Sequence, residues 1–148
     1  MLKITVVAVG TVKEQYMRDA IAEYVKRMSR EYKVTFEECR ECATVAEEGE
    51  LLLKKIPKDS FVVARDLHGR QMSSEKFASF ISGKTLEGVS HFAFVIGGSE
   101  GIDKKVTDAA GLRLCLSEMT FTHQMTRLIL AEQLYRAMKI NNGEKYHK

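Results

Sequence analysis

The chain alternates between short apolar runs and longer segments in which apolar residues recur every three or four positions. The apolar runs predict buried strands at 3–9, 34–39, 61–64, 91–96 and 112–116. The segments with helical spacing predict helices over 12–29, 44–56, 75–81, 103–110 and 122–140. Strands that alternate with helices are typical of an α/β domain with a mostly parallel sheet.

The stretch 91–101, which reads HFAFVIGGSEG, carries the clearest candidate for a ligand site. A continuous apolar run ends there at Gly97, and further glycines follow at 98 and 101. Adjacent glycines after a buried strand let another molecule approach the backbone closely, and Asp103 is suited to cap the next helix. Ligands of open α/β sheets bind at this edge. We therefore predict a nucleoside-type cofactor here, although the glycines alone fit a tight turn equally well.

A second candidate is the segment 117–124, SEMTFTHQ, which lies between a predicted strand and the start of the last helix. Core packing explains the apolar residues of that helix completely, but it does not explain this polar and aromatic segment. Backbone N–H groups at such a place commonly contact ligands.

Length and composition limit the class of protein. The 148 residues predict one domain over 1–148, and no apolar stretch approaches the ~18 residues of a membrane span. The first segment reads as a strand and lacks the cleavage signature of a signal peptide. With three cysteines and no such signal, the expected location is the cytoplasm. The net charge of +3 does not by itself indicate a nucleic-acid partner.

Three short motifs do not support the binding sites that they resemble. Gly83-Lys84-Thr85 resembles the end of a P-loop, but Ala78 stands where that loop needs glycine. The glycines at 97–101 do not follow the G-x-G-x-x-G pattern of dinucleotide-binding loops. Cys39 and Cys42 form a C-x-x-C without a second pair, among glutamates that would raise a thiol pKa. No metal site is expected.

Taken together, three stretches resemble one family. They are FVIGGSEG at 94–101, LSEMTFTHQMTR at 116–127 continuing into EQLYRA at 132–137, and the terminal YHK at 146–148. They resemble the bacterial RlmH family of the SPOUT methyltransferases, and the likeness covers essentially the whole chain. The resemblance implies an S-adenosylmethionine-dependent enzyme that methylates N3 of a pseudouridine in 23S ribosomal RNA. It also implies a homodimer and a SPOUT-type α/β fold with a deep trefoil knot in the carboxyl-terminal part.

The resemblance also implies site residues. Cofactor contacts carry over to Arg65, Gly97, Leu116, Ser117, Glu118, Met119, Thr120 and Phe121. Relatives have an aliphatic residue at the position of Arg65, and a guanidinium cannot pack against adenine in the same way. We expect it to turn outward or to pair with Asp66.

The carboxyl-terminal tail is the predicted RNA-binding element. Tyr146, His147 and Lys148 are its candidate RNA contacts, and Arg127 is a further candidate that a structural salt bridge would explain as well. The N3 imide must lose a proton before methylation, so His147, which titrates near neutrality, is the candidate catalytic residue. Lys148 is suited to hold a phosphate or the developing anion.

Two alternatives remain open from the sequence. One is a catalytically silent SPOUT protein that binds the ribosome. The other is a different nucleotide-binding α/β enzyme, such as a flavodoxin-like protein that takes flavin. For the methyltransferase and for the silent ribosome-binding protein alike, the weak net charge favours the assembled ribosome over naked RNA, because affinity built on phosphate contacts falls steeply with salt.

Overall fold

A computed structural model describes residues 1–144 of the chain. The elements follow the predicted order: β1 (Leu2–Val9), α1 (Gln15–Met28), β2 (Tyr32–Cys39), α2 (Val45–Lys55), β3 (Phe61–Gln71), α3 (Ser74–Leu86), β4 (His91–Ile96), α4 (Lys104–Ala109), β5 (Leu112–Cys115) and α5 (His123–Asn141). All ten predicted elements are therefore present, with differences at their ends. No helix in the described part of the chain is long and apolar enough to span a membrane.

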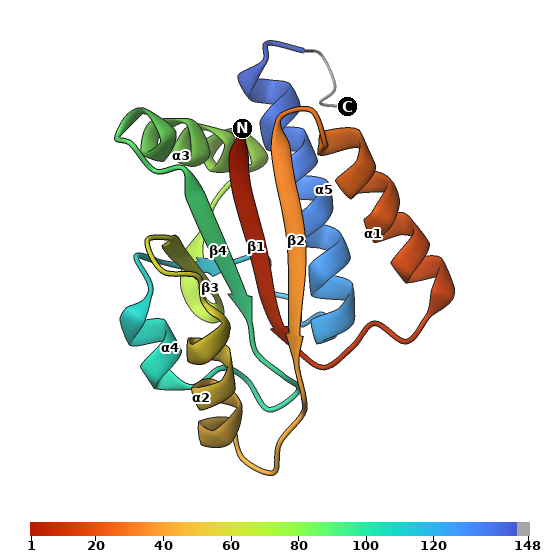
Figure 1. Ribbon diagram of the computed structural model, residues 1–148, viewed down its shortest axis with the longest axis vertical. Coiled ribbons are helices and arrows are strands. Elements are labelled where there is room, and N and C mark those ends of the chain that lie inside the picture. The colour runs from red at the N-terminus through yellow and green to blue at the C-terminus, as the bar shows by residue number, and fades with distance from the viewer. Residues whose placement is uncertain (145–148) are drawn as a thin grey trace.

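The five strands form one sheet in the order β2-β1-β4-β3-β5, and every pairing is parallel. Helices α1, α3 and α5 cover one face of the sheet, and α2 with α4 covers the other (Figure 1). This confirms the predicted α/β fold with a parallel sheet flanked by helices. The trefoil knot and the single domain over 1–148 stay predictions.

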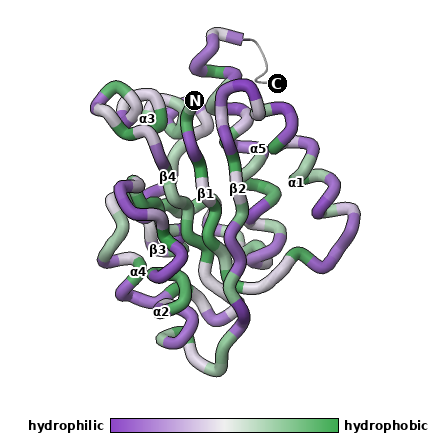
Figure 2. Tube along the Cα trace, in the orientation of Figure 1, coloured by the Kyte–Doolittle hydropathy of each residue, from purple (hydrophilic) through white to green (hydrophobic). Residues whose placement is uncertain are grey.

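The core lies along the two inner strands β1 and β4. Residues 4–9 of β1 and 92–96 of β4 are buried throughout, because helices cover both faces of these strands. Figure 2 shows the same strands as largely hydrophobic segments within a more polar outline. Phe92 packs edge-on against Phe61 and stacks on Phe94, with ring centroids 6.0 and 6.2 Å apart. The sheet is thus rigid where it leads into the glycine loop.

Side-chain caps fix the start of four helices. The side-chain oxygen of each cap accepts a hydrogen bond from a backbone N–H of the first turn. These caps are Thr44 of α2, Ser73 of α3, Asp103 of α4 and Thr122 of α5. The cap predicted at Asp103 is confirmed, and Thr122 caps α5.

Strand β3 is much longer than predicted. The apolar pattern predicts a strand that ends at residue 64, whereas the structure continues it to Gln71. The additional residues are mostly polar and show no strand pattern of hydropathy. Arg65, Arg70 and Gln71 among them pair with β5. Between Arg65 and Arg70 this pairing is interrupted, and the intervening residues leave the regular register. This irregular part of β3, the excursion at 66–69, places residues 66–68 beside the glycine loop after β4.

Arg127 anchors α5 to the sheet. Its side chain has no exposed surface. The guanidinium donates to the carbonyl oxygens of Val9 and Gly10 at 2.7 and 2.9 Å, and to the Glu38 carboxylate at 2.7 Å. The first half of α5 is therefore tied to the carboxyl ends of β1 and β2.

We expect Arg127→Ala to lower the free energy of unfolding by about 3 kcal/mol, because it opens a cavity and leaves buried carbonyl groups without their donor. Urea unfolding followed by circular dichroism measures this change. The control is Lys104→Ala, which removes an exposed pair with Asp108 and should cost less than about 1 kcal/mol. Equal losses in the two variants would contradict an anchoring role.

Candidate functional site

The candidate site lies where the carboxyl ends of β3, β4 and β5 meet. Because the strands are parallel, these ends share one edge of the sheet. Arg65 of β3, Gly97 after β4 and Leu116 after β5 come from three distant parts of the chain. Arg65 lines one cavity with Gly97 and another with Leu116. The structure thus brings these three predicted residues together.

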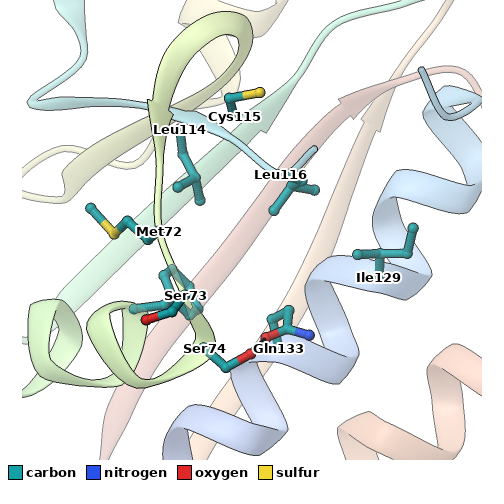
Figure 3. Close-up of a pocket in the computed structure, with 9 residues that line it drawn as sticks. Met72, Ser73, Ser74, Leu114, Cys115, Leu116, Ile129 and Gln133 are labelled. Atoms are coloured by element: carbon teal, nitrogen blue, oxygen red, sulfur yellow. Dashed lines mark hydrogen bonds between the residues drawn. The ribbon is translucent and has the colours of Figure 1, made fainter. Parts of the chain in front are cut away.

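One cavity of about 260 Å³ lies between the ends of β3 and β5 and helix α5. Figure 3 shows Met72, Leu114 and Leu116 on the strand side and Ile129 and Gln133 on α5. A hydrogen bond of 2.6 Å from the Ser74 hydroxyl to the Gln133 amide oxygen closes it near α3. The sequence singled out Leu116 in this cavity but not Met72, Ser74 or Gln133, which have no local signature.

A second cavity, of about 240 Å³, lies between the excursion of β3 and the glycine loop. Asp66, Leu67 and His68 form one side, and 97–102 forms the other. The backbone at Gly97 is packed so closely that a Cβ would overlap the Gly101 carbonyl oxygen and lie 2.9 Å from the Ile102 Cα. Glycine at position 97 therefore allows the loop to close on itself at the edge of the cavity.

Arg65 lines the second cavity and also a narrow space of about 10 Å³ that it shares with Leu116 and core side chains. Leu114 and Leu116 line both this narrow space and the first cavity. Pockets for small molecules usually measure about 300 to 1,000 Å³, so each of these two cavities is small on its own.

Residues 116–121 form an irregular connection between β5 and α5. The Ser117 hydroxyl accepts a hydrogen bond from the Met119 backbone at 3.0 Å, and the Ser117 carbonyl accepts one from the Cys115 thiol at 3.2 Å. Met119 is 75% exposed, and Glu118 and Thr120 are exposed as well. Leu116 and Phe121 are half-buried at the two ends. The predicted cofactor contacts in this segment are accessible at its centre and anchored at its ends.

Arg65 neither turns outward nor pairs with Asp66. The guanidinium is half-buried, and burial lowers its pKa while the nearby Cys115 and Asp66 raise it. Asp66 instead accepts a hydrogen bond from the His68 backbone at 3.0 Å and lies 4.0 Å from Arg113. Within residues 1–144, no hydrogen bond or ion pair holds the Arg65 guanidinium.

Two further residues lie near the site; His123 belongs to the predicted segment 117–124, and Glu48 of α2 was missed from the sequence. His123, the first residue of α5, has a buried Nδ1 with no hydrogen-bond partner in the described chain, and its Nε2 lies 3.8 Å from Glu41. Glu48 of α2 is buried, accepts a hydrogen bond from the Cys42 backbone and faces Gly98. In the sequence, Glu48 is explained as one of the acidic residues at the start of a helix. No pattern around His123 indicates that its Nδ1 atom is buried.

Arg127, predicted either as an RNA contact or as part of a structural salt bridge, forms a salt bridge in the described fold. The side chain is buried, and its two terminal nitrogens are occupied by Glu38 and by backbone carbonyls. A contact of Arg127 with RNA stays a prediction. The other predicted RNA contacts, Tyr146, His147 and Lys148, lie outside the described residues.

The cysteines and carboxylates do not assemble a metal site in the described part of the chain. Cys39 is buried and Cys42 half-buried, and both thiols are free. Burial is the main cause that raises the pKa of the Cys39 thiol. Among residues 1–144, no three His, Cys, Asp or Glu side chains lie together as metal ligands.

The comparison with known families assigns the class of protein. A model described as "Predicted SPOUT methyltransferase" matches residues 2–147. The chain therefore belongs to the SPOUT methyltransferase family, as its motifs indicate.

Individual relatives are similar along their full length. A protein of Carboxydothermus hydrogenoformans named ribosomal RNA large subunit methyltransferase H is 47% identical over 159 aligned positions, which cover 99% of this chain and all of the relative. Proteins with the same name from Bifidobacterium adolescentis and Clostridium beijerinckii are 45% and 43% identical at the same coverage.

We expect Gly97→Ala to destabilise the protein by about 1 to 3 kcal/mol and to weaken ligand binding at the loop, because the added methyl group forces the backbone at 101–102 to move. Thermal unfolding and calorimetric titration measure both effects. Gly83→Ala on α3 is the matched control; its Cβ meets nothing within 4 Å, so stability should stay equal or rise slightly. A Gly97→Ala variant as stable as Gly83→Ala would contradict the close packing.

The protonation of His123 makes the stability of the fold depend on pH. Burial first, and then Arg127 and Arg65, lower its pKa below the ordinary 6.5, while Glu41 and Glu48 oppose this. The unfolded chain therefore takes up the proton near pH 6.5 and the folded chain only at lower pH. The contribution of His123 to the free energy of unfolding is therefore retained above pH 6.5 and is lost progressively as the pH falls below 6.5. His91 acts in the same direction.

Denaturant unfolding between pH 7.5 and 5 tests this dependence. His123→Asn, which cannot titrate, should lose less stability over this range than the wild type. A slope as steep in His123→Asn as in the wild type would show that His123 makes no contribution.

Proposed function

We propose that this protein is an S-adenosylmethionine-dependent methyltransferase that acts on N3 of a pseudouridine in 23S ribosomal RNA. The observation that carries the proposal is the convergence of Arg65, Gly97 and the segment 116–121 at one edge of the sheet, in a member of the SPOUT methyltransferase family. The names of the full-length relatives support ribosomal RNA as the substrate.

The residues present fit the cofactor. The loop at Gly97 and the segment 117–120 offer hydrogen-bonding groups. The cavity beside Leu116 combines apolar side chains such as Ile129 with the polar Ser74 and Gln133, which suits an uncharged ring that carries hydrogen-bonding atoms. When bound, the cofactor supplies an electrophilic methyl group on a sulfonium. The protein's part is mainly to align that methyl group with the target nitrogen, because an in-line displacement depends on positioning.

The target nitrogen must also be made nucleophilic. An imide N–H is a poor nucleophile until its proton leaves, so a base or a nearby cation accelerates the reaction. We assign these roles to His147 as the base and to Lys148 as the group that holds phosphate or the developing anion, with Tyr146 as a further RNA contact. Placing these residues over the target nucleotide is the function we propose for the tail.

We further propose a homodimer that acts on the assembled ribosome in the cytoplasm. A net charge of +3 gives few phosphate contacts, so shape recognition of a folded particle is favoured over binding of naked RNA. The homodimer rests on the resemblance to the RlmH family. Membership of the SPOUT family replaces the flavodoxin-like alternative, and a catalytically silent member is an outcome of the experiment below.

Calorimetric titration with S-adenosylhomocysteine, followed by transfer of a labelled methyl group to ribosomes lacking the modification, tests the function. We expect saturable binding and incorporation at one pseudouridine. Binding without methyl transfer would identify a silent member, and binding of flavin in place of the cofactor would overturn the proposal. Naked ribosomal RNA methylated as fast as whole ribosomes would contradict recognition of the assembled particle.

Deletion of residues 146–148 tests the tail separately. We expect methyl transfer to be lost while affinity for S-adenosylhomocysteine stays within about twofold, because the cofactor groups lie elsewhere in the fold. His147→Asn should reproduce most of the loss. Unchanged methyl transfer in the truncated protein would refute the proposed role.

A further inference from the structure

Arg65 presents a positive charge to the candidate site and forms no ion pair within residues 1–144. Its guanidinium is half-buried within β3, beside the break in the pairing with β5, and no carboxylate in residues 1–144 lies within 4 Å of it, although the charge of Asp66 acts on it from further away. A guanidinium taken partly out of water is stabilised best by an anion that can accept two of its hydrogen bonds. Residues 1–144 supply no such partner.

The charged groups around Arg65 are already committed elsewhere or carry the same sign. Asp66 accepts from the His68 backbone and lies closest to Arg113. Arg127, across the sheet edge on α5, is bound to Glu38. Glu48 accepts a hydrogen bond from the Cys42 backbone. The Arg65 guanidinium, which has only the nearby Cys115 and Asp66 in its favour, therefore has hydrogen-bond donors left for an anionic group of a ligand.

The position of Arg65 limits which part of a ligand it meets. It lines the cavity with Gly97 and also the narrow space with Leu116, so a ligand that reaches from the glycine loop toward Leu116 contacts it. S-adenosylmethionine has one anionic group, its carboxylate, and two cationic groups, its sulfonium and its ammonium. A guanidinium attracts the first and repels the other two.

We propose that Arg65 binds the carboxylate of the methionine part of the cofactor and so sets which cavity holds that part. This inference rests on the proposed function, because it assumes that the site holds S-adenosylmethionine. It goes further in assigning one side chain to one group of the ligand. The competing contact for a guanidinium is stacking on the adenine ring.

The experiment compares two ligands against three proteins by calorimetric titration. The ligands are S-adenosylhomocysteine and the same molecule without its carboxylate, and the proteins are the wild type, Arg65→Leu and Arg70→Leu. Arg70 is the matched control, because it lies on the same strand, is exposed and does not line the cavities. We expect Arg65→Leu to weaken S-adenosylhomocysteine about ten- to one-hundred-fold. The decarboxylated analogue should bind Arg65→Leu and the wild type within about threefold of each other.

The outcomes separate this inference from the proposed function. An equal loss of both ligands in Arg65→Leu would refute the carboxylate contact in favour of stacking on adenine, with the cofactor site intact. Unchanged affinity for both ligands would refute any contact at Arg65. A wild type that binds neither ligand would refute the proposed function, and the inference with it. Arg65→Lys should retain part of the difference between the two ligands, because it keeps the charge but not the bidentate geometry.

Discussion

The buried guanidinium of Arg127 is the interaction on which the arrangement of the site depends. It joins α5 to the last carbonyl groups of β1 and to Glu38 on β2, so the start of the helix has one fixed place at the sheet edge. The segment 116–121 must then connect the end of β5 to that fixed point. A side chain that binds no ligand thereby determines where the proposed cofactor loop lies.

The parallel sheet supplies the second condition. Parallel strands end at one edge, so residues as distant in sequence as 65, 97 and 116 become neighbours. The break in register between β3 and β5 then widens this edge and makes room for a cavity beside the glycine loop. Arg65 lines this cavity and also the narrow space beside Leu116, so a charged residue lies on the wall of the site.

Much of the architecture could be predicted because it depends on local patterns. Buried strands such as 91–96 are continuous apolar runs, and caps such as Asp103 lie at the start of helical spacing. The end of β3 could not be predicted, since polar residues form a strand there only because β5 is available to pair with them. Gly97 and the segment 117–124 could be predicted as ligand contacts from the buried strand that ends in glycines and from the polar segment before the last helix, whereas their assignment to a particular cofactor came from a resemblance to a family.

What the sequence by itself determined is the order of the elements, the parallel α/β class and the segments that end at the ligand edge. These follow from hydropathy and capping, which act over a few residues. Only the tertiary structure decided that Arg127 is an anchor, that Glu48 and the Nδ1 atom of His123 are buried beside the site, and that Arg65 has no hydrogen bond or ion pair within residues 1–144. Burial and pairing of charged side chains depend on groups contributed by distant strands and helices, and those neighbours exist only once the chain has folded.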